Sequence, residues 1–206
     1  MVEEQLQRRG ISDARVLAAL RNVPRHLFVP EELHHSAYTD HPLPIGEGQT
    51  ISQPYIVALM TSALHLQGHE RVLEIGAGSG YHTAILAELA LEVFAVERLP
   101  ALMRHVSERL RGLGYLNVHL APGNGSLGWP EHAPYDAIVV GAAAPDVPQS
   151  LVDQLADPGI MILPIGPPEA QMLTEVEKRR GAVHRRALTG CVFVPLVGRE
   201  GWPEAS

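Results

Sequence analysis

The organisation of the chain follows from one glycine-rich segment, Glu74-Ile75-Gly76-Ala77-Gly78-Ser79-Gly80-Tyr81. It comes directly after a short β-rich run, residues 71–75, and before a helix expected over residues 83–91. Glycines at such a junction allow a tight turn and let a ligand approach the backbone, and the free N–H groups of the helix start favour an anionic group. The segment therefore predicts a ligand site where a strand of an α/β fold ends.

The residues after this segment alternate between strand and helix patterns. Besides 71–75, strands are expected at residues 92–97, 118–121, 137–140 and 160–163, and a second helix at 100–113. Such alternation implies parallel strands with helical crossovers on both faces. The predicted fold class is α/β, a doubly wound and mostly parallel sheet of the Rossmann-like type.

The residues before the segment, 1–68, are expected to form an N-terminal helical cap and an active-site loop. Ser12 and Asp13 are candidate caps for a first helix that ends before Pro24. Residues 36–53 read as a long ordered loop, and Ser52 or Gln53 is then expected to cap a second helix whose first residue is Pro54.

Two further zones complete a single domain, 1–206, around the expected ligand-binding core of residues 69–165. In residues 166–198, two β-like runs, 172–177 and 183–188, predict a hairpin, and residues 192–196 predict a last strand. Residues 199–206 are expected to be a frayed tail.

Composition narrows the classes of function. The 206 residues are 46% hydrophobic and 19% charged, an ordinary globular balance, and the net charge of −7 argues against nonspecific nucleic-acid binding. The single cysteine forms no internal disulfide, and the 11 histidines show no ligand spacing, so no metal site is expected. No signal peptide or membrane span is visible, so we expect a cytoplasmic protein. We also expect it to be a monomer and to bind neither nucleic acid nor membranes.

The spacing of the glycines favours one ligand class over another. The loop reads G-x-G-x-G and continues with Tyr81, so it departs from the dinucleotide pattern G-x-G-x-x-G. An acidic residue before the loop, Glu74, is typical of S-adenosylmethionine sites. Glu97 ends the next strand, where a carboxylate can accept both ribose hydroxyls. NAD binding and a glycine turn without ligand are the alternatives.

Several stretches outside the loop resemble the protein-L-isoaspartate O-methyltransferase family over residues 2–198. They are Pro24-Arg25-His26-Leu27-Phe28-Val29-Pro30, Ala37-Tyr38-Thr39-Asp40, Leu43-Pro44-Ile45-Gly46-Glu47-Gly48-Gln49-Thr50-Ile51-Ser52-Gln53-Pro54-Tyr55, Gly128-Trp129-Pro130, Ala133-Pro134-Tyr135-Asp136 and Phe193-Val194-Pro195-Leu196. The stretch Gly48 to Pro54 is the most specific of these.

The resemblance implies an activity and its residues. The family methylates the misplaced α-carboxylate of L-isoaspartyl residues in damaged proteins and peptides, and the ester recloses to succinimide, which begins repair. The cofactor is S-adenosyl-L-methionine and the product S-adenosyl-L-homocysteine. By resemblance Ser52 is the active-site serine, and Val194 pairs with substrate main chain. The implied cofactor-binding residues are Thr50, Ile51, Glu74, Gly76, Ala77, Gly78, Ser79, Gly80, Glu97, Asn124 and Gly125.

Four positions depart from the family's usual pattern. The family usually has Thr at Ala77 and Asp at Asn124, the position that accepts from the adenine amino group. It often has Val-Thr-Ala-Ala at residues 140–143 and Arg at Val192. The first two departures bear on cofactor affinity and the last two on the fit of the substrate.

The chemistry agrees with the absence of an evident catalytic base in the sequence. A carboxylate has a reference pKa near ~4 and is ionised at neutral pH, so alignment and exclusion of water are what a site must supply. A neutral donor such as Ser52 suits a reaction that cancels two opposite charges. Two alternatives remain at this point: a carboxyl methyltransferase dedicated to one peptide of a biosynthetic pathway, and a non-catalytic cofactor-binding protein.

Overall fold

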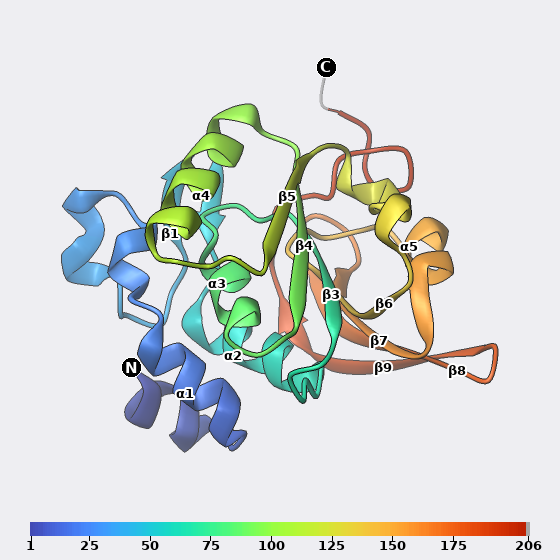
Figure 1. Ribbon diagram of the computed structural model, residues 1–206, viewed down its shortest axis with the longest axis horizontal. Coiled ribbons are helices and arrows are strands. Elements are labelled where there is room, and N and C mark those ends of the chain that lie inside the picture. Colours follow the sequence, from blue (N-terminus) through green and yellow to red (C-terminus); the bar gives the residue numbers. More distant parts are fainter. Residues whose placement is uncertain (205–206) are drawn as a thin grey trace.

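The computed structural model describes residues 1–204, and a seven-stranded sheet lies at its centre (Figure 1). The strand order is β5-β4-β3-β6-β7-β8-β9. The parallel strands are β3 (Arg71–Ile75), β4 (Glu92–Glu97), β5 (Val118–Pro122), β6 (Tyr135–Val140) and β7 (Leu155–Ile165). Antiparallel pairing adds β8 (Gln171–Arg179) and β9 (Ala182–Cys191). The expected doubly wound, mostly parallel sheet is confirmed.

Alternate strand residues face the two sides of the sheet and build two cores. Val72 and Val93 belong to one buried cluster, and their neighbours Leu73 and Phe94 belong to the other. The first cluster is covered by α1 (Ala14–Asn22), α2 (Pro54–Ala63), α3 (Tyr81–Ala87) and α4 (Pro100–Gly112), and the second by α5 (Gln149–Gln154). Helices thus cover both faces, as parallel strands with crossovers require.

The chain changes direction across the sheet between β3 and β6. From β3 it proceeds outward through β4 and β5, and it then returns to β6 on the other side of β3. The Gly141 N–H donates to the Ile75 carbonyl over 2.8 Å, which joins the ends of these two strands. A crevice at the carboxyl ends of such strands is where open α/β sheets bind ligands.

The N-terminal segment is built from short turns. Its helical pieces besides α1 are Val2–Leu6, Gln7–Arg9, Arg25–Phe28 and Glu31–Ser36, and Gly125–Leu127 and Pro130–His132 are similar turns in the core. The Asp13 carboxylate caps α1 by accepting the N–H groups of Arg15 and Val16, as expected.

The prediction of a loop over residues 36–53 was wrong in part, because this stretch contains a two-stranded hairpin. β1 (Leu43–Gly46) pairs antiparallel with β2 (Gln49–Ile51). Gly46 and Glu47 have positive φ angles of 90° and 51° at the turn. The many Gly, Pro and polar residues hide so short a ladder from a reading of hydrophobic alternation.

Three other boundaries differ from the prediction. The helix α3 begins at Tyr81 and ends at Ala87, earlier than the expected 83–91. Residues 192–196 form only an isolated bridge, Ala143 to Pro195, in which the Ala143 N–H donates to the Val194 carbonyl and the Leu196 N–H donates to the Ala143 carbonyl. The prediction of a frayed tail from residue 199 was wrong for residues 200–202: the Glu200 carboxylate accepts from the N–H and hydroxyl of Ser150, and the Trp202 N–H donates to the Leu196 carbonyl. Residues 205–206 lie outside the described chain.

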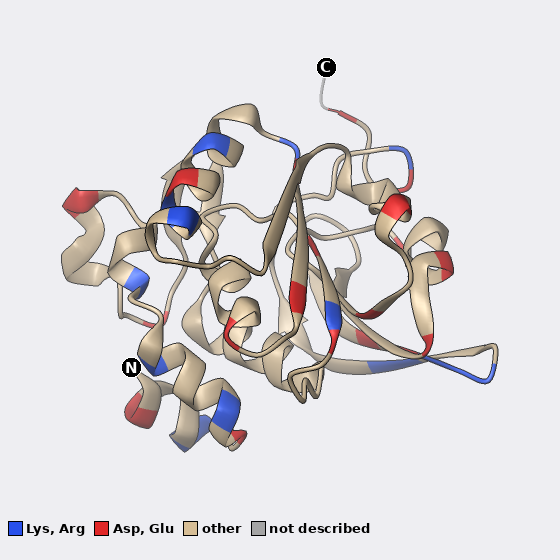
Figure 2. Ribbon diagram, in the orientation of Figure 1, with Lys and Arg blue, Asp and Glu red and all other residues tan. Residues whose placement is uncertain are grey.

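The basic residues of the C-terminal hairpin lie on a projection of the sheet edge (Figure 2). Arg185 pairs with Asp146 over 2.6 Å, and Arg186 pairs with Glu175 over 2.6 Å. Charged side chains on an edge strand discourage pairing with another chain. Within residues 1–204, no helix is long and apolar enough to span a bilayer.

Candidate active site

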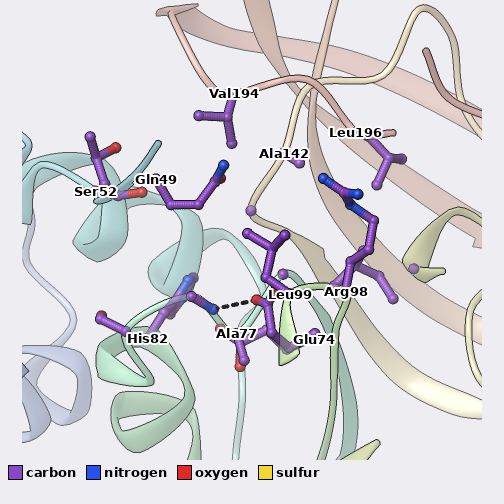
Figure 3. A pocket seen from close by; sticks show the side chains of 18 of the residues that line it. Gln49, Ser52, Glu74, Ala77, His82, Arg98, Leu99, Ala142, Val194 and Leu196 are labelled. Carbon is purple, nitrogen blue, oxygen red and sulfur yellow. Dashed lines mark hydrogen bonds between the residues drawn. The ribbon is translucent and has the colours of Figure 1, made fainter. Parts of the chain in front are cut away.

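A cavity of about 260 Å³ lies at the carboxyl ends of β3, β4 and β6. Its walls come from the glycine loop, from the residues after β4 and β6, from the β2–α2 junction and from residues 194–197. In Figure 3, Ser52 and Gln49 lie on one side, Arg98 and Leu196 on the opposite side, and Val194 above them. The cavity therefore coincides with the crevice that the strand order predicts.

The glycine loop is held in a conformation that glycine adopts without strain. Gly78 has a φ of 55°, and its N–H donates to the Glu97 carboxylate over 2.8 Å. At Gly125, across the cavity, a Cβ atom would lie 2.3 Å from Cγ2 of Ile75, so no larger residue fits without a shift. Both positions keep backbone close to the space that a ligand would occupy.

Glu97 serves the loop as well as the cavity. The residue is 5% exposed, and its Oε1 accepts the Leu99 N–H over 2.9 Å while its Oε2 accepts from Gly78. Each carboxylate oxygen keeps a further lone pair for a hydroxyl of a ligand. Glu97 therefore joins the loop after β3 to the turn after β4 and retains acceptor capacity toward the cavity.

Glu74 is a buried carboxyl group in the cavity wall. It is 2% exposed, and its Oε2 has no hydrogen-bond partner among the described residues. Burial raises the pKa of Glu74 to about 8, and the nearby Glu97 carboxylate adds to the increase. A buried acceptor without a partner beside a cavity fits a ligand that carries a donor or a positive charge at this place.

Ser52 lies between β2 and α2, and its hydroxyl is not used by the helix. Gln53 occupies the N-cap position of α2, and no side-chain cap bond is formed there. The expected capping by Ser52 or Gln53 was therefore wrong, because Asp40 Oδ1 accepts the first-turn Tyr55 N–H over 2.9 Å instead. Among the described residues, the Ser52 carbonyl makes a hydrogen bond and its hydroxyl makes none.

Most of the residues named from the sequence meet at this one cavity. Its lining includes Thr50, Ile51, Ser52, Glu74, Gly76, Ala77, Gly78, Ser79, Glu97, Gly125 and Val194. Gly80 is absent from the lining and instead forms the N-cap of α3 with a φ of 84°. Asn124 is absent too: its Oδ1 accepts from the N–H and hydroxyl of Ser126 over 3.1 and 2.9 Å.

Sequence reasoning missed several polar residues of the lining, among them Gln49, His82 and Arg98. Burial lowers the pKa of His82 to about 4, and its Nε2 lies 3.0 Å from the Thr61 hydroxyl, so the ring is neutral at physiological pH. The late predicted start of α3 left His82 outside the helix. Arg98 pairs with Glu204 over 2.9 Å. Its position directly after Glu97 could have predicted that it lines the cavity. In residues 1–204, no group of three or more His, Cys, Asp or Glu side chains is placed to hold a metal ion.

The parallel sheet, the glycine loop at its switch point and the two acidic strand ends define a Rossmann-like methyltransferase. The chain belongs to the protein-L-isoaspartate(D-aspartate) O-methyltransferase (PCMT) family, whose model matches residues 1–201.

Individual relatives agree with this placement. A protein-L-isoaspartate O-methyltransferase of Methanoculleus marisnigri is 55% identical over 202 residues, which are 98% of this chain and 92% of the relative. A solved protein-L-isoaspartate O-methyltransferase superposes with a TM-score of 0.86 at 28% identity, over 98% of this chain and 67% of that one. A Plasmodium falciparum structure described as a putative member, in complex with S-adenosyl-L-homocysteine, gives a TM-score of 0.83 at 30% identity, over 95% and 96% of the two chains.

Proposed function

We propose that the cavity between the glycine loop and Ser52 is the place where this protein carries out the reaction of its family. The protein is an S-adenosylmethionine-dependent enzyme that methylates the α-carboxylate of L-isoaspartyl residues in damaged proteins and peptides. The ester then recloses to succinimide, which starts repair. The free hydroxyl of Ser52 in the cavity wall is the observation that carries the assignment of the site.

The residues of the cavity fit the cofactor. Glu97 keeps lone pairs for the two ribose hydroxyls, and the loop at Gly76 and Gly78 presents backbone to a carboxylate. The unpartnered Glu74 Oε2 in the cavity wall offers an acceptor for a cationic part of the cofactor. When bound, S-adenosylmethionine supplies an electrophilic methyl group.

The chain's own residues align the nucleophile. The substrate carboxylate is ionised at neutral pH, so it attacks without a base, and the electron pair of the broken bond stays on sulfur. We assign Ser52 to donate a hydrogen bond to the carboxylate oxygen that does not attack, which orients the other oxygen toward the methyl group. As a neutral donor, Ser52 does not hold the negative charge of the ground state as strongly as a lysine or arginine would.

We assign substrate main-chain binding to Val194. Its carbonyl already accepts the Ala143 N–H over 2.8 Å, so the group left for a peptide is the Val194 N–H. The neighbouring Val192 side chain is 72% exposed and makes an apolar rim where the family often has arginine. Backbone pairing suits an enzyme that accepts many sequences, because it reads no side chain. From the sequence we further propose that the enzyme acts as a monomer in the cytoplasm.

Methyl transfer to matched peptides tests the proposal. Two unrelated sequences are made, each with L-isoaspartate and with aspartate at the same position. We expect transfer to both isoaspartyl peptides and none above background to either aspartyl twin. Equal transfer to the isoaspartyl and aspartyl forms would contradict the substrate assignment, and transfer to only one sequence would point to a dedicated peptide.

A further inference from the structure

The loop that carries Ser52 is held by side chains from distant parts of the sequence. One of them is Arg25, in the turn Arg25–Phe28, which is fully buried at 0% exposure. Its Nε donates to the Ala37 carbonyl over 2.7 Å, and its Nη2 donates to the Ser52 carbonyl over 2.8 Å. Burying a guanidinium costs free energy unless its N–H groups are hydrogen-bonded. These two charge-assisted bonds therefore hold the Ala37 and Ser52 carbonyls against the buried Arg25 side chain.

Asp40 holds the other side of the same loop. Its Oδ2 accepts from Gln53 Nε2 over 2.8 Å, and its Oδ1 accepts the Tyr55 N–H over 2.9 Å. The Asp40 carbonyl takes a second bond from Gln53 Nε2 over 2.9 Å. A negative charge at the N-terminus of α2 is also favourable toward the helix dipole. Asp40 therefore caps the N-terminus of α2, although it lies 15 residues before Tyr55 in the sequence.

Arg9 binds the same Asp40 carboxylate from the solvent side. Its Nη1 donates to Asp40 Oδ2 over 2.5 Å, and its guanidinium carbon lies 3.4 Å from the centre of the Tyr55 ring. Arg9 is half exposed, so its ion pair is weaker than the buried bonds of Arg25.

These contacts fix the Ser52 carbonyl and the residues that follow it at the start of α2, and they leave the Ser52 hydroxyl free. We propose that Asp40 and Arg25 are positioning residues for the Ser52 hydroxyl: they set the distance and direction of its hydrogen bond to the substrate carboxylate without touching substrate or cofactor. This inference rests on the proposed role of Ser52. A displacement of about 1 Å at a reacting geometry costs up to about 100-fold in rate, so such a frame has a measurable effect on turnover.

The test is a double-mutant cycle between Asp40→Asn and Ser52→Ala in the full chain. Asparagine has nearly the shape of aspartate, but it loses the charge and turns an NH₂ group toward one of the donors that now point at Asp40. With an isoaspartyl peptide, Asp40→Asn lowers kcat/KM by up to about 100-fold when Ser52 is present, and by no more than Ser52→Ala does. In the Ser52→Ala enzyme the same change costs less than about twofold, because no hydroxyl remains to be misplaced.

A matched control separates positioning from general damage. Asp157 also accepts two backbone N–H groups, those of Arg180 and Gly181, at the hairpin tip far along the chain from Ser52. Asp157→Asn leaves kcat/KM unchanged with and without Ser52. Calorimetry with S-adenosylhomocysteine gives affinities within about threefold of the parent for both aspartate variants, because Glu97 and the glycine loop are untouched.

Each outcome has one meaning. An equal loss from Asp40→Asn in both backgrounds, or no loss in either, overturns the positioning role. If Ser52→Ala itself leaves kcat/KM unchanged, the assignment of Ser52 fails instead, whatever Asp40 does. If Asp40→Asn fails to fold, Gln53→Met replaces it in the same cycle, because it removes the amide that donates to Asp40. Arg25→Lys is used in the same way, because it keeps the positive charge but cannot reach both carbonyls.

Discussion

The sheet core and the N-terminal segment that faces it across the cavity are held together in different ways. In the core, residues 71–165, parallel ladders and the burial of both sheet faces fix the strand ends, and α4 runs for 13 residues. In residues 1–68, the turns between α1 and β1 are four to six residues long, and the only ladder joins β1 to β2 within the described chain. Side chains such as Arg25 and Asp40 supply the long-range bonds there.

The two halves of the site therefore depend on different interactions: backbone pairing in the sheet and side-chain hydrogen bonds in the N-terminal segment. Glu74 and Glu97 lie at strand ends, so the backbone of the sheet places them. Ser52 lies in a short junction whose position depends on a few polar side chains. Changes at the strand ends are therefore expected to alter cofactor affinity, and changes in the segment are expected to alter turnover.

The largest effect on affinity is expected from Glu97→Ala. Two charge-assisted bonds to ribose, at about 1.5–3 kcal/mol each before competition from water, imply that S-adenosylhomocysteine binds at least about tenfold more weakly. Glu97 also accepts the N–H groups of Gly78 and Leu99 within the fold. We therefore expect a loss of about 1–3 kcal/mol in the free energy of unfolding as well.

Calorimetric titration and urea unfolding measure the two effects, with Glu97→Gln as the control that keeps one carbonyl oxygen. Glu97→Gln is expected to fall between the parent and Glu97→Ala in both measurements. An unchanged affinity in Glu97→Ala would remove Glu97 from the cofactor site and leave it a purely structural role.

An intermediate effect is expected from Glu74→Gln on the pH dependence of stability. The pKa of Glu74 rises from its ordinary value of 4.5 to about 8 in the fold, so between these values the folded state binds a proton that the unfolded state has released. This group therefore makes the ligand-free protein less stable as pH rises from about 4.5 to about 8, with no further change above.

Glutamine carries no proton to release, so Glu74→Gln removes this fall. The difference in unfolding free energy between variant and parent grows in favour of the variant across that range. The low pKa of His82 acts in the opposite direction below about 6.5 but is common to both proteins, so it cancels in the difference. A difference that stays constant with pH would show that Glu74 ionises normally.

The smallest effect is expected from Asn124→Asp. The family pattern alone suggests several-fold tighter cofactor binding, because a carboxylate accepts from an amino group about twice as strongly as an amide. In the structure, however, Asn124 Oδ1 is engaged by Ser126, and aspartate preserves both bonds. We therefore expect the affinity for S-adenosylhomocysteine to change less than about threefold. A larger gain would place this side chain at the adenine after all.

The sequence predicted the sheet core, residues 71–165, better than the N-terminal segment, residues 1–68, for a physical reason. Short β-rich runs and the glycine loop are local patterns, so β3, β4 and their acidic residues Glu74 and Glu97 could be predicted. The hairpin β1–β2 and the capping of α2 by Asp40 depend on pairings between distant residues, which no local pattern contains. Resemblance identified Ser52 and the stretch containing Asp40, and only the structure shows what Asp40 contacts.

The most direct test of the division between the two halves is Ser52→Ala, measured for both functions in one preparation. Loss of one positioned neutral hydrogen bond, about 1–3 kcal/mol of transition-state stabilisation, lowers kcat/KM for an isoaspartyl peptide about 5- to 150-fold. The dissociation constant of S-adenosylhomocysteine stays within about twofold of the parent. Unchanged kcat/KM, or a loss of cofactor affinity as large as the loss of turnover, would contradict the account.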